Sequence, residues 1–485
     1  MHSNDIYTLI AFIVYICCMT AIGLIYYRRT FNLSDYILGG RKLNTWVTSM
    51  SAQASDMSGW LLLGLPGFAY VAGMEAFWLV LGLWVGTYLN WKVVARRLRE
   101  YTERLNDSLT LPDYFENRFN DKSKVLRIIS AVFILVFFGI YVSSGFVAGA
   151  KLFSTVFDFS YMTALIVGVS VIIIYTFLGG FMAVSWTDFF QGSLMFIAII
   201  AVPVFGFKLT GGVSGAVQQI RNINPELLNI FTDSSGAKLG AIAIISNLAW
   251  GLGYYGQPHI LARFMAINSP DNIPRARHIA MTWVTFSLIF AVVVGMLGLA
   301  GLQQSLEGPD SEKVFMILID VLFHPLIAGI FLSAVLAAIM STADSQLLVA
   351  SSALTEDLYK VLLRRHASQT ELVWISRCAV IMIAIIAFLI ATDPASSVLN
   401  LVAYAWAGFG ATFGPLIIMS LYWKGMTRTG ALGGMIVGGV TVIIWKNLSG
   451  GLFDMYEMAP GFVLSFLAIY LFSKLTTVKA HVSSF

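Results

Sequence analysis

Apolar runs of close to 20 residues recur along almost the entire chain, and this repetition restricts its fold more than any other feature. About 20 consecutive apolar residues cross the hydrocarbon core of a bilayer as an α-helix. The runs are continuous, whereas the strands of a membrane β-barrel alternate apolar and polar residues. Of the 485 residues, 58% are hydrophobic and 12% are charged, a charged fraction about half that of a soluble domain. We therefore expect an all-α polytopic membrane protein.

The runs predict about 13 transmembrane helices. They form a single transmembrane transport domain over residues 1–485, because no connection is long enough to fold separately. The stretch from Val314 to Phe323 is amphipathic, so we expect it in an external loop. The expected spans are residues 6–26, 46–72, 75–94, 126–153, 161–178, 187–207, 238–258, 279–302, 326–354, 372–391, 397–423, 427–446 and 459–476.

The lysines and arginines fall mainly on one side of these spans. Arg28 and Arg29 follow the first span, and most of the other basic residues share their side. Because cytoplasmic connections are enriched in Lys and Arg, we expect the N-terminus outside and the C-terminus in the cytoplasm. The opposite side holds only Lys151, Lys208, Arg221, Lys238, Lys313 and Lys446.

Two expected spans are interrupted by polar or glycine-rich sequence. The first break is Ser49–Trp60 (SMSAQASDMSGW), and the second is Asn247–Pro258 (NLAWGLGYYGQP), about five spans later. Paired broken helices in two halves indicate an inverted-repeat transporter with a binding site near the membrane midplane. The repeats would cover residues 46–207 and 238–423, leaving the first span and residues 427–476 outside them. The alternative is that glycine is simply frequent in membrane helices.

Asp56 is the most informative residue of the first break. An ionised carboxylate in hydrocarbon costs several kcal/mol, so Asp56 must face a cavity, a cation or a partner. Ser58 and Gly59 favour local unwinding, which would free backbone carbonyls to coordinate a small cation. The structural alternative is an aspartate that only pairs with another helix.

The span at 326–354 carries oxygen atoms that complement this break. On a helix, the carbonyl of Ala338 lies near the hydroxyls of Ser341 and Thr342, three and four residues later. Hard cations take oxygen ligands, so this patch suits Na⁺. Serine and threonine in membrane helices also commonly bond back to their own backbone, and the pattern alone is weakly specific.

Two further acids lie in or near spans. Asp188 either caps the N-terminus of its helix or, together with Asp344, forms a second cation site or shares a proton. Asp344 is harder to explain by capping, because it lies inside an apolar span.

Aromatic residues flank both breaks. They could stack on a small ring or cover a cationic amine, although most aromatic residues of such a chain pack or face lipid. The four beside the breaks are Trp60, Tyr141, Trp250 and Tyr254.

The sequence argues against an enzyme. Its histidines fall at termini, loops or expected span ends, without partners at the spacing of a metal site or of a nucleophile. The glycine-rich stretches do not match a phosphate-binding loop, so we do not expect transport to be driven by ATP. We expect no nucleic-acid partner either, because the basic residues follow membrane topology. An ion gradient would have to supply the energy.

Several motifs resemble those of the solute:sodium symporter family, and the resemblance extends from Tyr7 to about Leu475. It is carried by collinear segments and is especially close to the bacterial proline carriers of that family. The most specific segments are Asp35–Arg41 (DYILGGR), Ala54–Leu61 (ASDMSGWL), Leu111–Phe115 (LPDYF), Gly179–Asp188 and Thr355–Tyr359 (TEDLY).

This resemblance implies Na⁺-coupled symport of L-proline into the cell by alternating access, in a bacterial-type inner membrane. It implies a leucine-transporter-like 5+5 inverted repeat with Na⁺ held between the first break and the span at 326–354. The implied Na⁺ ligands are the carbonyls of Ala54, Met57 and Ala338 and the hydroxyls of Ser341 and Thr342, with Asp56 in support. The implied substrate-binding residues are Ser58, Trp60, Gly64, Tyr141, Trp250, Tyr254 and Pro258, and Arg41 matches another transport-linked position.

The chain departs from the family pattern at the second cation site of some members. There, an acid that matches Asp188 works with hydroxyl groups, but this chain has Asp344 and Ser345 at the corresponding hydroxyl positions. The Na⁺ stoichiometry is therefore open. Two other functions also stay open: a symporter of the same family for another small amino acid or a carboxylate, and a membrane sensor that binds its substrate without moving it. About ten residues follow the last span, and this disfavours a sensor with a signalling domain.

Overall fold

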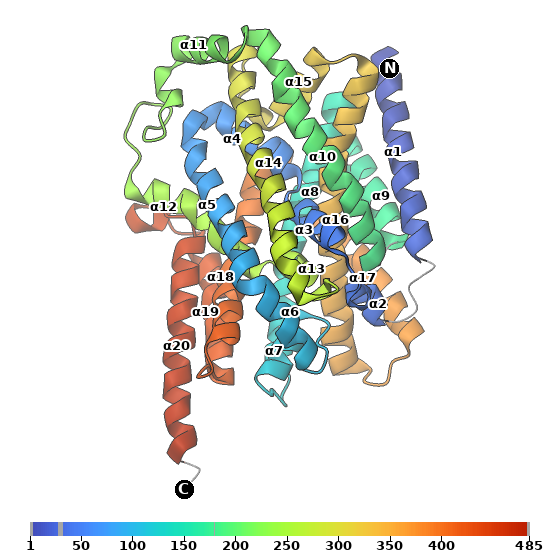
Figure 1. Cartoon of the computed structure of the whole chain (residues 1–485), viewed down its shortest axis with the longest axis vertical. Helices are drawn as coiled ribbons and strands as arrows, with labels where there is room; N and C mark the ends of the chain where they lie inside the picture. The colour runs from blue at the N-terminus through green and yellow to red at the C-terminus, as the bar shows by residue number, and fades with distance from the viewer. Residues whose placement is uncertain (1–2, 28–32, 179, 483–485) are drawn as a thin grey trace.

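The computed structural model describes residues 3–27, 33–178 and 180–482. Arg28, Arg29 and Gly179, which contribute to the sequence predictions, lie outside the described residues. The described chain is a bundle of upright helices, and the ends of the chain lie at opposite ends of the bundle (Figure 1). This placement agrees with an odd number of membrane crossings.

Most of the long helices are unbroken. Among the described residues, 10 helices are long and apolar enough to cross a membrane, counting helical segments that join end to end as one. The long regular helices are α1 (Ser3–Tyr27), α8 (Val125–Phe157), α9 (Tyr161–Leu178), α10 (Phe181–Thr210), α14 (Ile273–Gly301), α16 (Pro325–Ser352), α17 (Gln369–Ile390), α18 (Val398–Tyr422), α19 (Arg428–Trp445) and α20 (Met458–Val482).

The two expected spans with breaks are divided into segments, and a third path is also composite. The first broken path is α3 (Thr45–Asp56), η2 (Trp60–Gly64) and α4 (Leu65–Ala72). The second is α12 (Ala241–Ala249), η6 (Trp250–Gly256) and α13 (Pro258–Ala266). The composite path is α5 (Ala76–Leu89), η4 (Asn90–Val94) and α6 (Ala95–Arg104), and α16 continues into η9 (Ala353–Leu363).

Short helices cover the two ends of the bundle. The segment expected in a loop forms α15 (Val314–Leu322), with Phe315 buried and Val321 exposed, as the amphipathic pattern predicts. Nine residues are too few to cross a bilayer. The other short helices are α2 (Leu33–Leu38), η1 (Gly39–Arg41), α7 (Leu111–Arg118), η3 (Gly73–Glu75), α11 (Val213–Ile223), η5 (Pro225–Leu228), η7 (Pro270–Asn272), η8 (Gly308–Lys313) and η10 (Gly451–Asp454).

Several helices run beyond the predicted span ends. α10 begins at Phe181 rather than 187, α13 continues to Ala266, and α6 continues to Arg104. The extension of α6 is strongly charged, and the hydropathy pattern fails there because ion pairs support the helix outside the apolar layer. In α6, for example, Arg99 and Glu103 pair at 2.6 Å across one helical turn. The extensions of α10 and α13 are largely apolar and buried.

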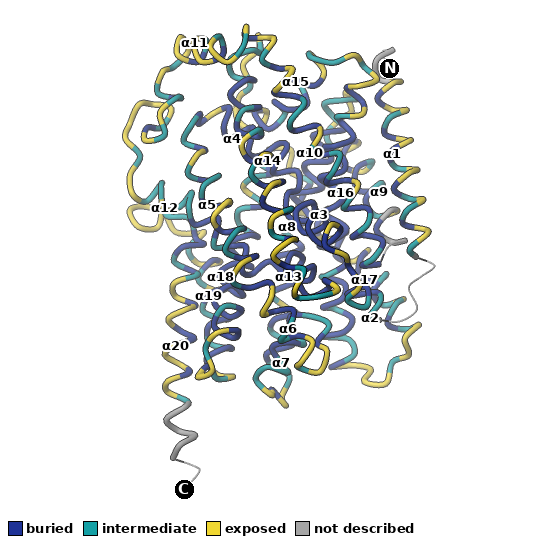
Figure 2. Tube along the Cα trace, in the orientation of Figure 1, coloured by how far each residue is buried: buried dark blue, intermediate teal, exposed yellow. Residues whose placement is uncertain are grey.

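Burial separates central from peripheral helices. In α16 and α18, 78% of the most apolar window is buried inside the protein, against 33% in α1, α17 and α20. Figure 2 shows the same contrast between the interior of the bundle and its outer helices. In the interior, α16 packs against α3, α8 and α10, and α3 also packs against α10. The break in α3 therefore lies next to α16, as the predicted cation site requires.

Candidate cation and substrate site

The first break releases backbone oxygens from the helical ladder. α3 ends at Asp56, and Met57 leaves helical geometry with φ −85° and ψ 75°. The Ser58 amide donates to the Asp56 carbonyl at 3.0 Å rather than to Ala54, its partner in a regular helix. The Ala54 carbonyl is therefore available to another helix.

α16 supplies that contact. The Ser341 hydroxyl donates to the Ala54 carbonyl at 2.8 Å, and the Thr342 hydroxyl approaches the same oxygen at 3.3 Å. Ser341 also lies 3.3 Å from the Ala338 carbonyl of its own helix. Four of the five implied Na⁺ ligands thus form one buried oxygen cluster between α3 and α16. The fifth, Met57, follows the end of α3 and is fully buried.

Asp56 lies beside this cluster and is fully buried. Within the described residues, neither of its carboxylate oxygens has a hydrogen-bond partner. Its backbone carbonyl accepts from the Trp60 indole at 3.0 Å, which fixes the ring directly after the break. A buried carboxylate without a partner is costly, so this position favours a cation.

Two tyrosines from other helices close the same region. Tyr141 of α8 and Tyr254 of η6 are both buried and lie near Asp56. Among the described residues, neither hydroxyl makes a hydrogen bond of regular geometry, although the Tyr254 hydroxyl lies close to the Asp56 carboxylate. Tyr254 is oriented by an edge-on contact with Trp406 at 4.9 Å between ring centroids. With Trp60, these side chains form an aromatic enclosure that retains free polar groups.

The remaining predicted pocket residues are spread along the path through the bundle. Gly64 lines an outer cavity of about 370 Å³ together with Glu312 and Ser397. Pro258 borders a separate small cavity with Ile37 and other residues near the opposite end of the bundle. Gly64 also lies against Trp60, because a Cβ at residue 64 would be 3.5 Å from the Trp60 Cβ.

Trp250 packs away from the enclosure. Its ring stacks on Tyr456 at 5.4 Å between ring centroids, and its carbonyl accepts from the Trp406 indole at 2.8 Å. Trp406 fits here because residue 253 is glycine, where a Cβ would lie 1.9 Å from Trp406 Nε1. Ser58, by contrast, stays at the break, where its hydroxyl accepts from the Trp60 amide at 3.3 Å.

Asp188 does not cap a helix, and that alternative is wrong. α10 begins at Phe181, so Asp188 lies two turns inside it and is fully buried. Its Oδ2 accepts from Ser51 at 2.7 Å and from the Arg263 guanidinium at 3.1 Å. Arg263 also donates to Ser345 at 2.5 Å. Asp188 is therefore paired with an internal cation.

Asp344 lies next to this group and is fully buried, and neither of its carboxylate oxygens has a partner within the described residues. The structure thus brings Asp188, Asp344 and Ser345 together, but Arg263 is bound at their centre. Sequence reasoning missed Arg263 and treated it only as a marker of topology. The sequence signal for Arg263 was its place just beyond residue 258, the predicted end of the second broken span, where the structure continues that path as α13.

His259 also differs from the sequence interpretation, which placed every histidine at a terminus, loop or span end. The extension of α13 buries His259 completely, edge-on to Tyr141 at 5.8 Å between ring centroids. Its carbonyl accepts from Arg263 at 2.9 Å. The residue therefore joins the two polar regions of the interior.

Arg41 lies outside both groups. Its guanidinium binds Asp107 at 2.7 Å, the Met265 carbonyl at 2.6 Å and the Ser108 carbonyl at 2.9 Å. It thereby ties the segment before α3 to the end of α13 and to the loop after α6. Its contacts are those of a structural connector beside the first broken path.

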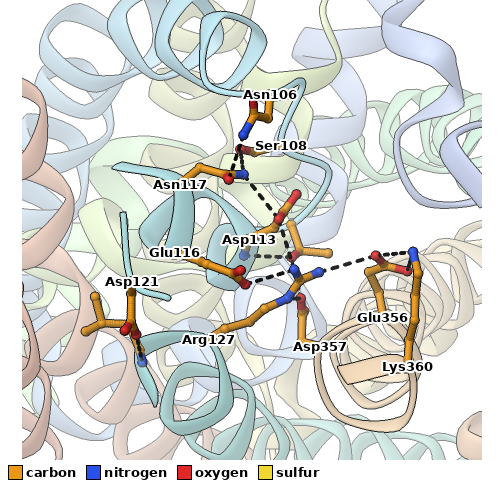
Figure 3. A network of polar contacts seen from close by, with 12 residues as sticks. Asn106, Ser108, Asp113, Glu116, Asn117, Asp121, Arg127, Glu356, Asp357 and Lys360 are labelled. Carbon is orange, nitrogen blue, oxygen red and sulfur yellow. Dashed lines mark hydrogen bonds and ion pairs between the residues drawn. The ribbon is translucent and has the colours of Figure 1, made fainter. Parts of the chain in front are cut away.

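A second polar network lies at the same end of the bundle (Figure 3). Arg127 at the start of α8 binds Asp357 at 2.7 Å, Glu116 at 3.0 Å and Asp113 at 3.1 Å. Its contact with Glu356 is 3.3 Å. Burial raises the pKa of the Asp113 carboxyl above its ordinary range, and the charge of Arg127 opposes that rise. The network connects α7, α8 and η9.

Comparisons with known proteins find similar chains over nearly the whole length. The chain is 53% identical over 472 residues to the sodium/proline symporter of Salmonella typhimurium (strain LT2), covering 96% of this chain and 93% of that protein. It is 51% identical over 465 residues to the high-affinity proline transporter PutP of Bacillus subtilis (strain 168), covering 96% and 97%.

Solved structures show the same fold. A Na⁺-coupled sialic acid symporter in a substrate-bound outward-open state matches with a TM-score of 0.81 at 18% identity, covering 97% of this chain and 98% of that one. Mhp1, a nucleobase-cation-symport-1 family transporter, matches in a closed conformation with a TM-score of 0.55 at 13% identity, covering 92% and 96%. The family model of the sodium:solute symporters matches residues 36–438. This chain belongs to the sodium:solute symporter family.

Proposed function

We propose that this protein carries L-proline into the cell by Na⁺-coupled symport. The observation that carries the proposal is the oxygen cluster of Ala54, Ser341 and Thr342 beside Asp56, whose carboxylate has no partner in the described residues. The identity of both curated relatives, each named as a proline transporter, supports the substrate.

Na⁺ would bind where the two helices already meet. The hydroxyls of Ser341 and Thr342 now donate to the Ala54 carbonyl, so a cation would require their protons to turn away and their lone pairs to turn inward. The carbonyls of Met57 and Ala338 complete the proposed set, and Asp56 supplies the compensating charge. Bound Na⁺ would hold the end of α3 against α16 and fix the shape of the break.

Proline would bind beside this cation. Its ring would lie in the enclosure of Trp60, Tyr141 and Tyr254, and its carboxylate would meet backbone amides of the break near Ser58 in exchange for the local bonds that they now make. Trp250, Gly64 and Pro258 would line the route on either side. Because both ligands act on one broken helix, their binding is coupled, and proline would tighten Na⁺ binding by the same factor as the reverse.

Alternating access requires two halves that can move against each other. We propose the 13-span arrangement with inverted repeats at residues 46–207 and 238–423. The two broken paths, α3 with α4 and α12 with α13, support it. The distribution of basic residues supports an N-terminus outside and a C-terminus in the cytoplasm of a bacterial cell membrane. We propose Na⁺ at the cluster between α3 and α16; near Asp188 and Asp344, Arg263 supplies one positive charge for two carboxylates and bonds to Asp188 and Ser345.

Uptake of labelled L-proline into proteoliposomes tests the function. We expect rapid uptake with an inward Na⁺ gradient and little with a proton gradient alone, because the oxygen cluster offers no proton relay. Equal rates with the two gradients would contradict the proposal. A panel of unlabelled amino acids and carboxylates, added as competitors, separates proline from other small substrates. Binding of proline without accumulation would indicate the sensor instead.

A further inference from the structure

An apolar groove of about 500 Å³ opens on the outer surface of the bundle between α3, α10 and α14, away from the proposed transport path. These three helices lie side by side (Figure 1). Trp46, at one rim, is 52% exposed, although a tryptophan at a helix contact is normally buried. The groove is lined by Trp46, Met50, Phe189, Ser193, Phe196, Ile197, His278, Ile279, Thr282 and Trp283.

The groove has a closed end and a charged end. Toward the middle of the bundle, Phe196 meets Phe286 of α14 with ring centroids 6.3 Å apart. At the other end, Arg275 lies three residues before His278 and seven before Thr282, on the face of α14 that lines the groove. Between Arg275 and Phe286, α14 rises by ~16 Å, about half of the ~30 Å hydrocarbon core.

The charge of Arg275 is free for a ligand. Its side chain is exposed, and the contacts of the described residues include no ion pair or hydrogen bond to it. The nearest acid before it in the chain, Asp271, is held by Arg96 at 2.7 Å. A basic group at the mouth of an apolar slot as long as one leaflet fits an anionic headgroup above an acyl chain.

We propose that this groove binds an anionic phospholipid of the cytoplasmic leaflet, with one acyl chain between α10 and α14 and its phosphate at Arg275 and His278. The assignment to that leaflet rests on the orientation proposed above. The binding itself does not depend on the transported substrate. Because α3 forms one wall through Trp46 and Met50, the lipid also contacts the helix whose end carries the cation site.

Lipid binding to the full-length purified protein tests this directly. Native mass spectrometry would count bound phosphatidylglycerol and phosphatidylcholine as each is titrated into the detergent solution. Arg275→Gln should weaken phosphatidylglycerol binding about fivefold, the factor that corresponds to the ~1 kcal/mol typical of one basic residue at an anionic surface. Ser193→Phe should fill the slot and reduce binding of both lipids.

Matched controls exist elsewhere on the chain. Arg365→Gln removes an exposed positive charge at the same end of the bundle, and Ser170→Phe adds an aromatic ring on the outer face of α9. Ser170 bonds back to its own helix at 2.7 Å, as Ser193 does. Neither control should change lipid binding, and elution as a single species would show that each variant is folded.

Equal binding of the two lipids with no effect of Arg275→Gln would overturn the proposal. A dimer that dissociates in Ser193→Phe without loss of lipid would also overturn it, because a second copy would then occupy the groove. Na⁺-driven proline uptake, measured in parallel, keeps the two proposals separate. Loss of lipid binding with uptake retained in phosphatidylcholine vesicles would support the groove and leave the transport function intact.

Discussion

Asp56 and Asp188 are two fully buried aspartates with opposite surroundings. Asp188 accepts from Ser51 and from the guanidinium of Arg263, so the protein supplies its counter-charge. The carboxylate of Asp56 has no partner in the described part of the chain. A buried charge must be paired, neutralised or bound to a cation. We therefore expect Asp188 to belong to the scaffold and Asp56 to act in Na⁺ binding.

The largest expected effect is on stability, at Asp188. Asp188→Asn should lower the free energy of unfolding by about 3–5 kcal/mol, because Arg263 would remain buried without its counter-charge. Thermal unfolding in detergent measures this change. The double variant Asp188→Leu with Arg263→Leu should recover much of the loss. If Asp188→Asn is as stable as the parent protein, Asp188 does not compensate the buried charge of Arg263.

Asp56→Asn should act on Na⁺ instead. We expect the half-saturating Na⁺ concentration for uptake to rise about tenfold or more, equivalent to ~1.4 kcal/mol, with little loss of thermal stability. Removing an unpaired charge relieves a desolvation cost, which is why folding should tolerate the change. Proline uptake at increasing Na⁺ concentrations measures the half-saturating concentration, and a melting curve on the same sample measures stability. Unchanged Na⁺ activation would remove Asp56 from the cation site.

Ser341→Ala should give a smaller change of the same kind. Loss of one neutral oxygen ligand should raise the half-saturating Na⁺ concentration about three- to tenfold, the range of ~0.5–1.5 kcal/mol for one hydrogen bond. Ser333→Ala is the control, because Ser333 lies on the same helix and bonds only to Gly329 at 2.8 Å. Equal effects of the two variants would mean that Ser341 contributes to the packing of α16 and not to Na⁺ binding.

The smallest effect concerns Asp113, a partly buried acid that shares its arginine with other acids (Figure 3). Burial raises the pKa of Asp113, so the folded state takes up a proton before the unfolded state does as the pH falls. Its contribution to stability therefore grows as the pH drops from neutral through this raised pKa, and levels off near the ordinary aspartate pKa of about 3.9.

Asp113→Asn should abolish that contribution. The change in stability between neutral and mildly acidic buffer, followed by the melting temperature, should then differ from that of the parent protein by less than ~1 kcal/mol. The exposed Asp393→Asn serves as the control. An unchanged pH dependence in Asp113→Asn would show that Arg127 keeps the carboxyl ionised over the whole range.

Much of the fold follows from local pattern. Every expected span coincides with a helix or a broken helix, because apolar length and glycine or proline breaks are properties of neighbouring residues. The cation cluster was predictable in part. The spacing of Ala338, Ser341 and Thr342 places three oxygens on one turn, whereas the choice of Ala54 as their partner came from resemblance.

The errors share a cause. The start of α10, the extension of α13 and the burial of His259 depend on ion pairs and packing between segments far apart in the chain, which a hydropathy window does not detect. Pro258 and Gly64 match the family pattern, yet their cavities lie on either side of the aromatic enclosure. A motif identifies a residue but not the conformation in which it meets its ligand.

The sequence by itself determined a helical membrane protein with two broken spans, an acid at the first break and hydroxyls on a late span, because these are features of composition and spacing. Only the tertiary structure decided which acid has an internal partner. Arg263 and Asp188 are 75 residues apart, and their 3.1 Å contact exists only in the folded chain, where α13 and α10 both pack against α3. Charge compensation depends on distance in space, and distance in space is what a linear sequence does not contain.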